Sequence, residues 1–183
     1  MSKRIKKNDT ILVLIDFQER LVPAMDDKEN TLTAASNILK GFEILGLPYL
    51  VTQQYTKGLG ESVAEIRNAA TSFTHIEKES FSAMAEPSFV KALADSGRKN
   101  VVIGGIEAHV CVLQTGLDLL DAGYQVFLVT DAITSRKKQS KKVAINRAIQ
   151  EGIVPVNVES VLFELLDNDS KSEQFRAISK TIK

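Results

Sequence analysis

The chain has 183 residues, of which 44% are hydrophobic and 25% charged, a composition typical of one globular domain with a sizeable core. Lys+Arg and Asp+Glu both total 23, so the balanced charge argues against a nucleic-acid partner and against an acidic membrane surface. The single cysteine, Cys111, excludes an internal disulfide and a multi-cysteine zinc site, and two histidines are too few for most imidazole-rich metal sites.

We therefore expect a protein without metal or cofactor, in the cytoplasm or another reducing compartment of the cell. No apolar run approaches the roughly 20 residues of a membrane-spanning helix, so no membrane partner is expected. The basic start, residues 1–9, predicts a solvated tail. Without internal repeats or linkers, residues 1–183 are interpreted as a single domain that closes with a helix inside residues 170–183.

Apolar runs and helix-periodic segments alternate along the chain, which predicts an α/β fold. The expected strands are residues 10–15, 48–52, 73–77, 101–106, 125–130 and 153–158. The expected helices are residues 31–45, 61–70, 87–96, 110–122, 141–150, 159–166 and 172–182. We predict an open, parallel, six-stranded sheet with helices on both faces, in a Rossmann-like three-layer arrangement, with the Pro155-containing strand at an edge.

Three chemically reactive residues follow strands of this sheet. Asp16 ends the first strand, Lys78 follows the third, and Cys111 lies just beyond the fourth, after Gly104 and Gly105. The carboxyl ends of parallel strands share one rim, where ligands bind at the point at which strand order reverses. A thiolate could attack an electrophilic carbon there, with Asp16 moving the proton and Lys78 supplying positive charge.

Two interpretations of Cys111 stay open at this point. Its position near a helix start favours a thiolate, because the helix dipole and a neighbouring lysine both lower a thiol pKa. The same lysine is expected to lower the pKa of Asp16. Alternatively, Cys111 is a small buried hydrophobe, since free cysteine is among the most buried residue types.

Three segments in order resemble the isochorismatase-like cysteine hydrolases: residues 12–18 (LVLIDFQ), residues 78–83 around Lys78, and residues 105–115 (GIEAHVCVLQT). The resemblance covers about residues 10–158 and is closest to the isochorismatase domain-containing proteins, through residues 53–60 (QQYTKGLG), 105–108 and 117–121. It implies a catalytic triad of Asp16, Lys78 and Cys111. It also implies a cis peptide bond between Ile106 and Glu107.

The resemblance further implies an oxyanion hole formed by the backbone N–H groups of Glu107 and Cys111. Nicotinamidases of this superfamily carry an Asp-x-His metal motif where this chain has TQQYT at residues 52–56, which argues against nicotinamidase activity and a catalytic metal. Isochorismatases proper lack the cysteine, which argues against hydrolysis of isochorismate.

Five further residues are candidates for the substrate pocket: Phe17, Gln18, Gln54, Tyr55 and Phe81. The aromatic members can equally belong to the core. His109 lies only two residues from Cys111, so its imidazole is expected to point elsewhere. Asp131, placed at the end of the fifth strand, is expected to cap a loop.

We expect a hydrolase that cleaves a C–N bond of amide type in a small-molecule substrate through a covalent intermediate on Cys111. The alternative is a catalytically weak scaffold or interaction protein that retains the hydrolase fold. Apolar helix positions such as Leu117 and Leu120 can serve either the core or a subunit interface, and a homo-oligomer is expected. A redox-sensing thiol is disfavoured because the chain has no resolving cysteine.

Overall fold

The structure is a computed structural model that describes residues 4–167 and 169–182. Its centre is a six-stranded sheet in the order β3-β2-β1-β4-β5-β6, and every neighbouring pair is parallel. The predicted fold class is confirmed, with the Pro155-containing strand at an edge. The strands are β1 (Thr10–Ile15), β2 (Tyr49–Gln54), β3 (Ile76–Lys78), β4 (Asn100–Ile106), β5 (Gln125–Thr134) and β6 (Val154–Val156).

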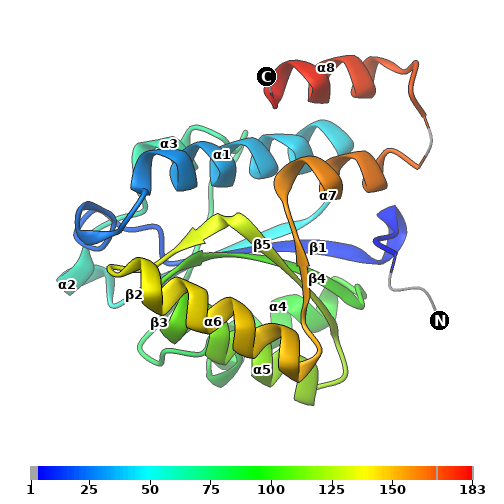
Figure 1. Ribbon diagram of the computed structural model, residues 1–183. Coiled ribbons are helices and arrows are strands. Elements are labelled where there is room, and N and C mark those ends of the chain that lie inside the picture. The colour runs from blue at the N-terminus through cyan, green and yellow to red at the C-terminus, as the bar shows by residue number, and fades with distance from the viewer. Residues whose placement is uncertain (1–3, 168, 183) are drawn as a thin grey trace.

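Helices cover both faces of the sheet (Figure 1). One face carries α1 (Lys28–Leu45), α3 (Ala64–Arg67) and α7 (Val158–Leu165), with α8 (Glu173–Thr181) outside α1. The other face carries α4 (Pro87–Asp95), α5 (Leu113–Asp121) and α6 (Lys138–Glu151). Short helical turns complete the chain: α2 (Thr56–Leu59), η1 (Lys7–Asp9), η2 (Val22–Ala24), η3 (Ala83–Ala85) and the π-turn η4 (Ala108–Val112).

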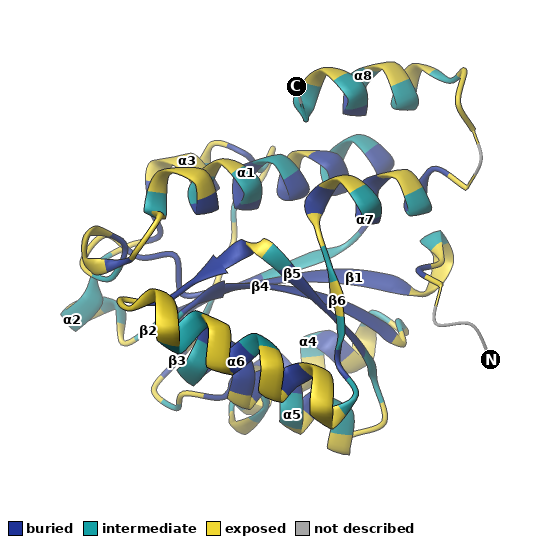
Figure 2. Ribbon diagram, viewed as in Figure 1, coloured by how far each residue is buried: buried dark blue, intermediate teal, exposed yellow. Residues whose placement is uncertain are grey.

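One apolar core lies on each face of the sheet, and the strands between them are largely buried (Figure 2). Along β1, Leu12 and Leu14 belong to the core beneath α1, whereas Val13 and Ile15 belong to the core beneath α4 and α5. Side chains alternate between the two faces of a strand, so a strand that is covered on both faces must be apolar throughout. This requirement explains the uninterrupted apolar run from which the first strand was predicted.

Several predicted boundaries are wrong. The helix expected at residues 61–70 is a single turn, Ala64–Arg67, because Ser62 forms an antiparallel bridge with Gln18 and the chain stays extended through Val63. The fifth strand continues to Thr134 instead of ending at residue 130, because its pairing with β4 shifts register after Ile103 and resumes between Gly105 and Ile133. The helix expected from residue 110 begins as the π-turn η4 and becomes α-helical at Leu113.

The predicted tail is also partly wrong. Residues 1–3 lie outside the described residues, but Ile5 is buried in the α1-side core. Its backbone N–H donates to Glu164 Oε2 of α7 at 2.8 Å. The free energy gained by burying the Ile5 side chain therefore outweighs the preference of the neighbouring basic residues for solvent.

The closing helix falls where it was expected, as α8, although residue 183 lies outside the described range. Within residues 4–167 and 169–182, the structure holds no helix that is both long and apolar enough to cross a membrane.

The strand order reverses between β1 and β4, and the backbones at their carboxyl ends come very close. Gly105 pairs with Ile15 and has a φ of +144°, a region that side chains rarely adopt. A Cβ atom added at Gly105 would lie 2.5 Å from the carbonyl oxygen of Ile15, so only glycine fits. Gly105 thereby allows Asp16 and the segment that carries Cys111 to lie next to each other.

We predict that Gly105→Ala lowers the free energy of unfolding by about 3 kcal/mol or more, because it combines backbone strain with a clash against a fixed strand. Gly123→Ala is the matched control: its φ is +85°, but no atom lies within 4 Å of the added Cβ, so about 1 kcal/mol is expected. Urea unfolding of both variants measures the difference. Equal losses of unfolding free energy in the two variants would contradict a clash between the added Cβ at residue 105 and Ile15.

Candidate active site

Asp16 lies at the carboxyl end of β1 and is fully buried. Its φ of 56° turns the chain out of the strand, and a residue other than glycine is uncommon in this conformation. Oδ1 accepts a hydrogen bond from Thr52 Oγ1 at 2.7 Å, and Oδ2 accepts one from Lys78 Nζ at 2.7 Å. The carboxylate is thus held on both oxygens by side chains from β2 and β3, which lie on the same side of β1 in the sheet.

Lys78, the last residue of β3, is also buried, and the exposed fraction of its side chain is 0%. Besides Asp16, its ammonium donates to the carbonyl oxygens of Ser80 at 3.0 Å and Phe81 at 3.1 Å. A fourth acceptor, Gln54 Oε1, lies at 3.3 Å. Burial of an ammonium is costly unless it is paired and hydrogen-bonded, and both conditions hold here.

Cys111 lies in the π-turn after β4, and 6% of the residue is exposed. Its Sγ donates to Gln54 Oε1 at 3.3 Å, and the Glu107 backbone N–H and the Asp16 carboxylate also interact with the thiol. The Thr115 hydroxyl donates to the Cys111 carbonyl at 2.7 Å, which holds the turn against α5. Asp16, Lys78 and Cys111, predicted from three separate strand ends, therefore lie together.

Burial dominates the electrostatics of these groups. It raises the pKa of Asp16 above its usual value, although Lys78 and the hydrogen bond from Thr52 oppose the shift. Burial and the nearby Asp16 charge raise the pKa of the Cys111 thiol to about 12, against the opposing effect of Lys78. Our expectation that both pKa values are lowered is wrong, because desolvation disfavours both charged forms more than the lysine favours them.

The peptide bond between Ile106 and Glu107 is cis, at the position that the resemblance implies. The backbone N–H of Glu107 hydrogen-bonds to the thiol. The Glu107 carboxylate accepts from the backbone N–H of Arg136 at 3.0 Å and from its Nε at 3.1 Å. These bonds tie the turn before Cys111 to the end of β5, while the oxyanion hole itself stays a prediction.

The five pocket candidates occupy different places. Phe17 is 1% exposed and packs in the α1-side core, so it supports the site from behind instead of facing a ligand. Gln18 is fully buried, and its amide binds backbone atoms of Gln54 and Gly60. The Gln54 side chain reaches both Lys78 and Cys111.

Tyr55 and Phe81 are 50% and 54% exposed. Each is bonded through its backbone to Lys78: the Tyr55 N–H donates to the Lys78 carbonyl, and the Phe81 carbonyl accepts from Nζ. The two exposed aromatic residues are therefore fixed beside the buried lysine.

Two other polar residues have structural partners away from the thiol. His109 Nδ1 lies 2.9 Å from Ser135 Oγ, as expected for an imidazole that faces away from Cys111. Asp131 lies within β5 instead of at its end, and its carboxylate accepts from the Val158 backbone N–H at the first turn of α7. Its capping role is as predicted, although the capped element is a helix.

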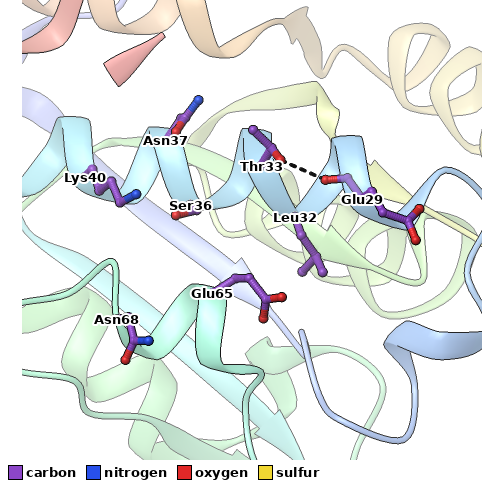
Figure 3. A pocket seen from close by; sticks show the side chains of 8 residues that line it. All are labelled: Glu29, Leu32, Thr33, Ser36, Asn37, Lys40, Glu65 and Asn68. Atoms are coloured by element: carbon purple, nitrogen blue, oxygen red, sulfur yellow. Dashed lines mark hydrogen bonds between the residues drawn. The ribbon is translucent and has the colours of Figure 1, made fainter. Parts of the chain in front are cut away.

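Among the described residues, neither a metal-binding cluster nor the groove between α1 and α3 coincides with this site. Across residues 4–167 and 169–182, no group of three or more His, Cys, Asp or Glu side chains is placed to hold a metal ion. An open groove of about 450 Å³ between α1 and α3 contains none of the predicted site residues (Figure 3). It is lined by Glu29, Leu32, Thr33, Ser36, Asn37, Lys40, Glu65 and Asn68.

Comparison with known proteins gives the family. The Isochorismatase domain matches residues 10–160 of this chain. The chain belongs to the isochorismatase family. Isochorismatase domain-containing protein 1 of Salmo salar is 36% identical over 175 residues, which are 95% of this chain and 61% of that protein, so the chain spans about three fifths of its length. Isochorismatase domain-containing protein 2 of Danio rerio is 34% identical over 98% of this chain and 89% of that protein.

Solved structures of the family share the fold. The MAR1 ribonuclease from Caenorhabditis elegans is 33% identical, with a TM-score of 0.91 over 98% of this chain and 92% of that chain. YcaC from Pseudomonas aeruginosa, solved with hexane-2,5-diol and covalent acrylamide, is 27% identical, with a TM-score of 0.92 over 99% and 92% of the two chains. The 24% identical YcaC of Escherichia coli, described as an octameric hydrolase of unknown specificity, has the same fold.

Sequence reasoning missed Thr52 and Thr115 as supports of this isochorismatase-family site. Thr52 pairs in register with Ile15. A polar residue at the end of the second strand could therefore have been recognised as a neighbour of Asp16. Thr115 follows Cys111 by one helical turn, the spacing at which a hydroxyl reaches a preceding carbonyl. The roles of the Ser80 and Phe81 carbonyls could not be predicted from the sequence, because every residue has a backbone acceptor.

We predict that Lys78→Met lowers the free energy of unfolding at neutral pH by about 3–5 kcal/mol, because it leaves the Asp16 charge buried and unpaired. The loss should shrink as the pH falls and Asp16 takes up a proton. The control is Lys91→Met, which breaks an exposed pair with Asp95 and should cost at most about 1 kcal/mol. Equal losses in urea unfolding would contradict a stabilising buried pair.

The raised thiol pKa gives a second prediction. Because only the thiolate is alkylated, the rate with iodoacetamide should be low at neutral pH and rise about tenfold per pH unit toward the pKa of about 12. Asp16→Asn removes a negative charge beside the sulfur and leaves Lys78 in place, so the pH profile should move to lower pH. A profile that is unchanged in Asp16→Asn would show that the carboxylate and the thiol are not coupled.

Proposed function

We propose that this protein is a cysteine hydrolase that cleaves an amide-type C–N bond of a small molecule through a covalent intermediate on Cys111. The observation that carries the proposal is the buried Asp16–Lys78 ion pair, 2.7 Å long, placed against the only thiol of the chain. A buried acid with a raised pKa, a fixed cation and a nucleophile are the parts that covalent acyl transfer needs.

In the first step, the Asp16 carboxylate takes the thiol proton, and Sγ bonds to the substrate carbonyl carbon. The carbonyl double bond opens, and the negative charge moves to its oxygen. The backbone N–H groups of Glu107 and Cys111 are proposed to stabilise this oxyanion. The resting thiol is neutral, because its pKa is about 12, so attack requires the neighbouring base.

In the second step, the protonated Asp16 gives its proton to the leaving nitrogen, the C–N bond breaks, and a thioester remains on Cys111. Asp16 then removes a proton from water, whose oxygen attacks the thioester carbon. The C–S bond breaks, the sulfur regains the proton, and a carboxylic acid leaves. A raised Asp16 pKa serves both directions of proton transfer, because catalysis is most efficient when the pKa lies near the working pH.

A small substrate is favoured because Cys111 is only 6% exposed and its acid and lysine partners are fully enclosed. Tyr55 and Phe81 are the exposed aromatic residues beside the lysine and are proposed to contact the substrate. The covalent acrylamide in Pseudomonas aeruginosa YcaC is a small amide-bearing electrophile, which agrees with a reactive nucleophile in a related protein.

We further propose that the protein is a cytoplasmic homo-oligomer. Helix α6 exposes the apolar side chains of Val143 and Ile149, which a second copy could cover. The octameric assembly of Escherichia coli YcaC supports an oligomer in a protein of the same fold. A scaffold without efficient catalysis is the alternative function, and the enclosed ion pair beside the thiol speaks against it, because well-packed apolar residues at these positions would stabilise a scaffold about as well.

A panel of small amides and carbamoyl compounds, with an RNA oligonucleotide added because a relative is named a ribonuclease, tests the proposal. We expect one of the small amides to be hydrolysed, and Cys111→Ala to lower its kcat/KM on the order of a thousandfold or more. His109→Gln should retain most of the turnover, because its imidazole faces Ser135. Turnover that is undiminished in Cys111→Ala would overturn the mechanism, and turnover of RNA alone would overturn the substrate class.

A further inference from the structure

Gln54, the last residue of β2, is clamped at its backbone, and its side-chain oxygen reaches both Lys78 and Cys111. Gln18 clamps its backbone, with Oε1 accepting the Gln54 N–H at 2.7 Å and Nε2 donating to the Gln54 carbonyl at 3.0 Å. By contrast, the Gln54 side-chain Nε2 has one long hydrogen bond, 3.5 Å, to the Glu79 carbonyl. The backbone clamp therefore fixes the point from which the side-chain amide reaches Lys78 and Cys111.

Lys78 fixes which way this amide points at rest. An ammonium is a donor only, so the Gln54 atom that faces Nζ at 3.3 Å must be the acceptor oxygen. The same Oε1 lies 3.3 Å from Cys111 Sγ. An oxygen that carries lone pairs repels a thiolate, so the sulfur facing it must carry its proton and donate it.

The thiol proton consequently has two neighbouring acceptors, Gln54 Oε1 and the Asp16 carboxylate. We propose that Gln54 is a positioning residue that touches the reacting sulfur and acts as a latch, holding Cys111 in its protonated resting form until the proton passes to Asp16. This inference rests on the proposed nucleophilic role of Cys111. The step moves one proton from sulfur to a carboxylate oxygen and requires no other reactant.

The contact of Gln54 with the thiol can be removed without loss of the hydrogen bonds that Lys78 needs. The ammonium has three protons but four acceptors, and Gln54 is the most distant of them. Without Gln54, the lysine still donates to Asp16, Ser80 and Phe81, all within 3.1 Å. A substitution at Gln54 therefore removes an acceptor from the thiol while leaving the ion pair satisfied.

The test is the pH dependence of Cys111 alkylation by iodoacetamide in Gln54→Met and Gln54→Glu. Loss of the oxygen in Gln54→Met should lower the thiol pKa and speed alkylation near pH 8 about tenfold, the factor for one pKa unit. An added carboxylate in Gln54→Glu should raise the thiol pKa and slow alkylation. A purely structural role would shift both variants in the same direction, through loosening of the site.

Gln150, exposed in α6, supplies the matched controls Gln150→Met and Gln150→Glu, which should leave the profile unchanged. Thermal unfolding followed by circular dichroism verifies that each variant is folded. If Gln54→Met does not fold, the nearly isosteric Gln54→Glu alone tests the proposal. An unchanged or faster rate of Cys111 alkylation in Gln54→Glu would then overturn the proposed role of Gln54. Alkylation needs no substrate, so its outcome is independent of whether the hydrolysis panel succeeds.

Discussion

The ion pair between Lys78 and Asp16 is the interaction on which the site depends. Both side chains are fully enclosed, and placing two charges in such surroundings costs several kcal/mol per ion unless each is paired and hydrogen-bonded. Thr52 and the carbonyls of Ser80 and Phe81 supply the remaining bonds. The pair therefore fixes the relative positions of three chain segments, and any thiol beside it experiences both charges.

The topology explains why these segments meet. In an open parallel sheet, ligands bind at the carboxyl ends of the strands where the order reverses, which here lies between β1 and β4 (Figure 1). Asp16 follows β1, and Cys111 follows β4 after the close approach at Gly105. The isochorismatase-family fold thus brings an acid and a thiol from distant parts of the chain to one rim.

The sequence was sufficient to predict the sheet and the three reactive residues, because the central strands are continuous apolar runs and Asp16, Lys78 and Cys111 each lie at or just beyond a strand end. It could not predict the direction of the thiol pKa, which depends on enclosure by residues from other segments. The extension of β5 to Thr134 was hidden because it follows a register shift. Gln54 was identified as a pocket residue, but its contact with both Lys78 and Cys111 depends on the side-chain geometry at the end of β2.

In the proposed mechanism, Cys111 becomes covalently attached to the substrate carbonyl carbon. Peptide mapping by mass spectrometry, after rapid acid quenching during turnover of a small amide, can detect this attachment. An added acyl group is expected on the peptide that contains Cys111, and none on the same peptide of Cys111→Ser under identical conditions. Continued turnover with no acyl group on Cys111, or with the group on another residue, would contradict it.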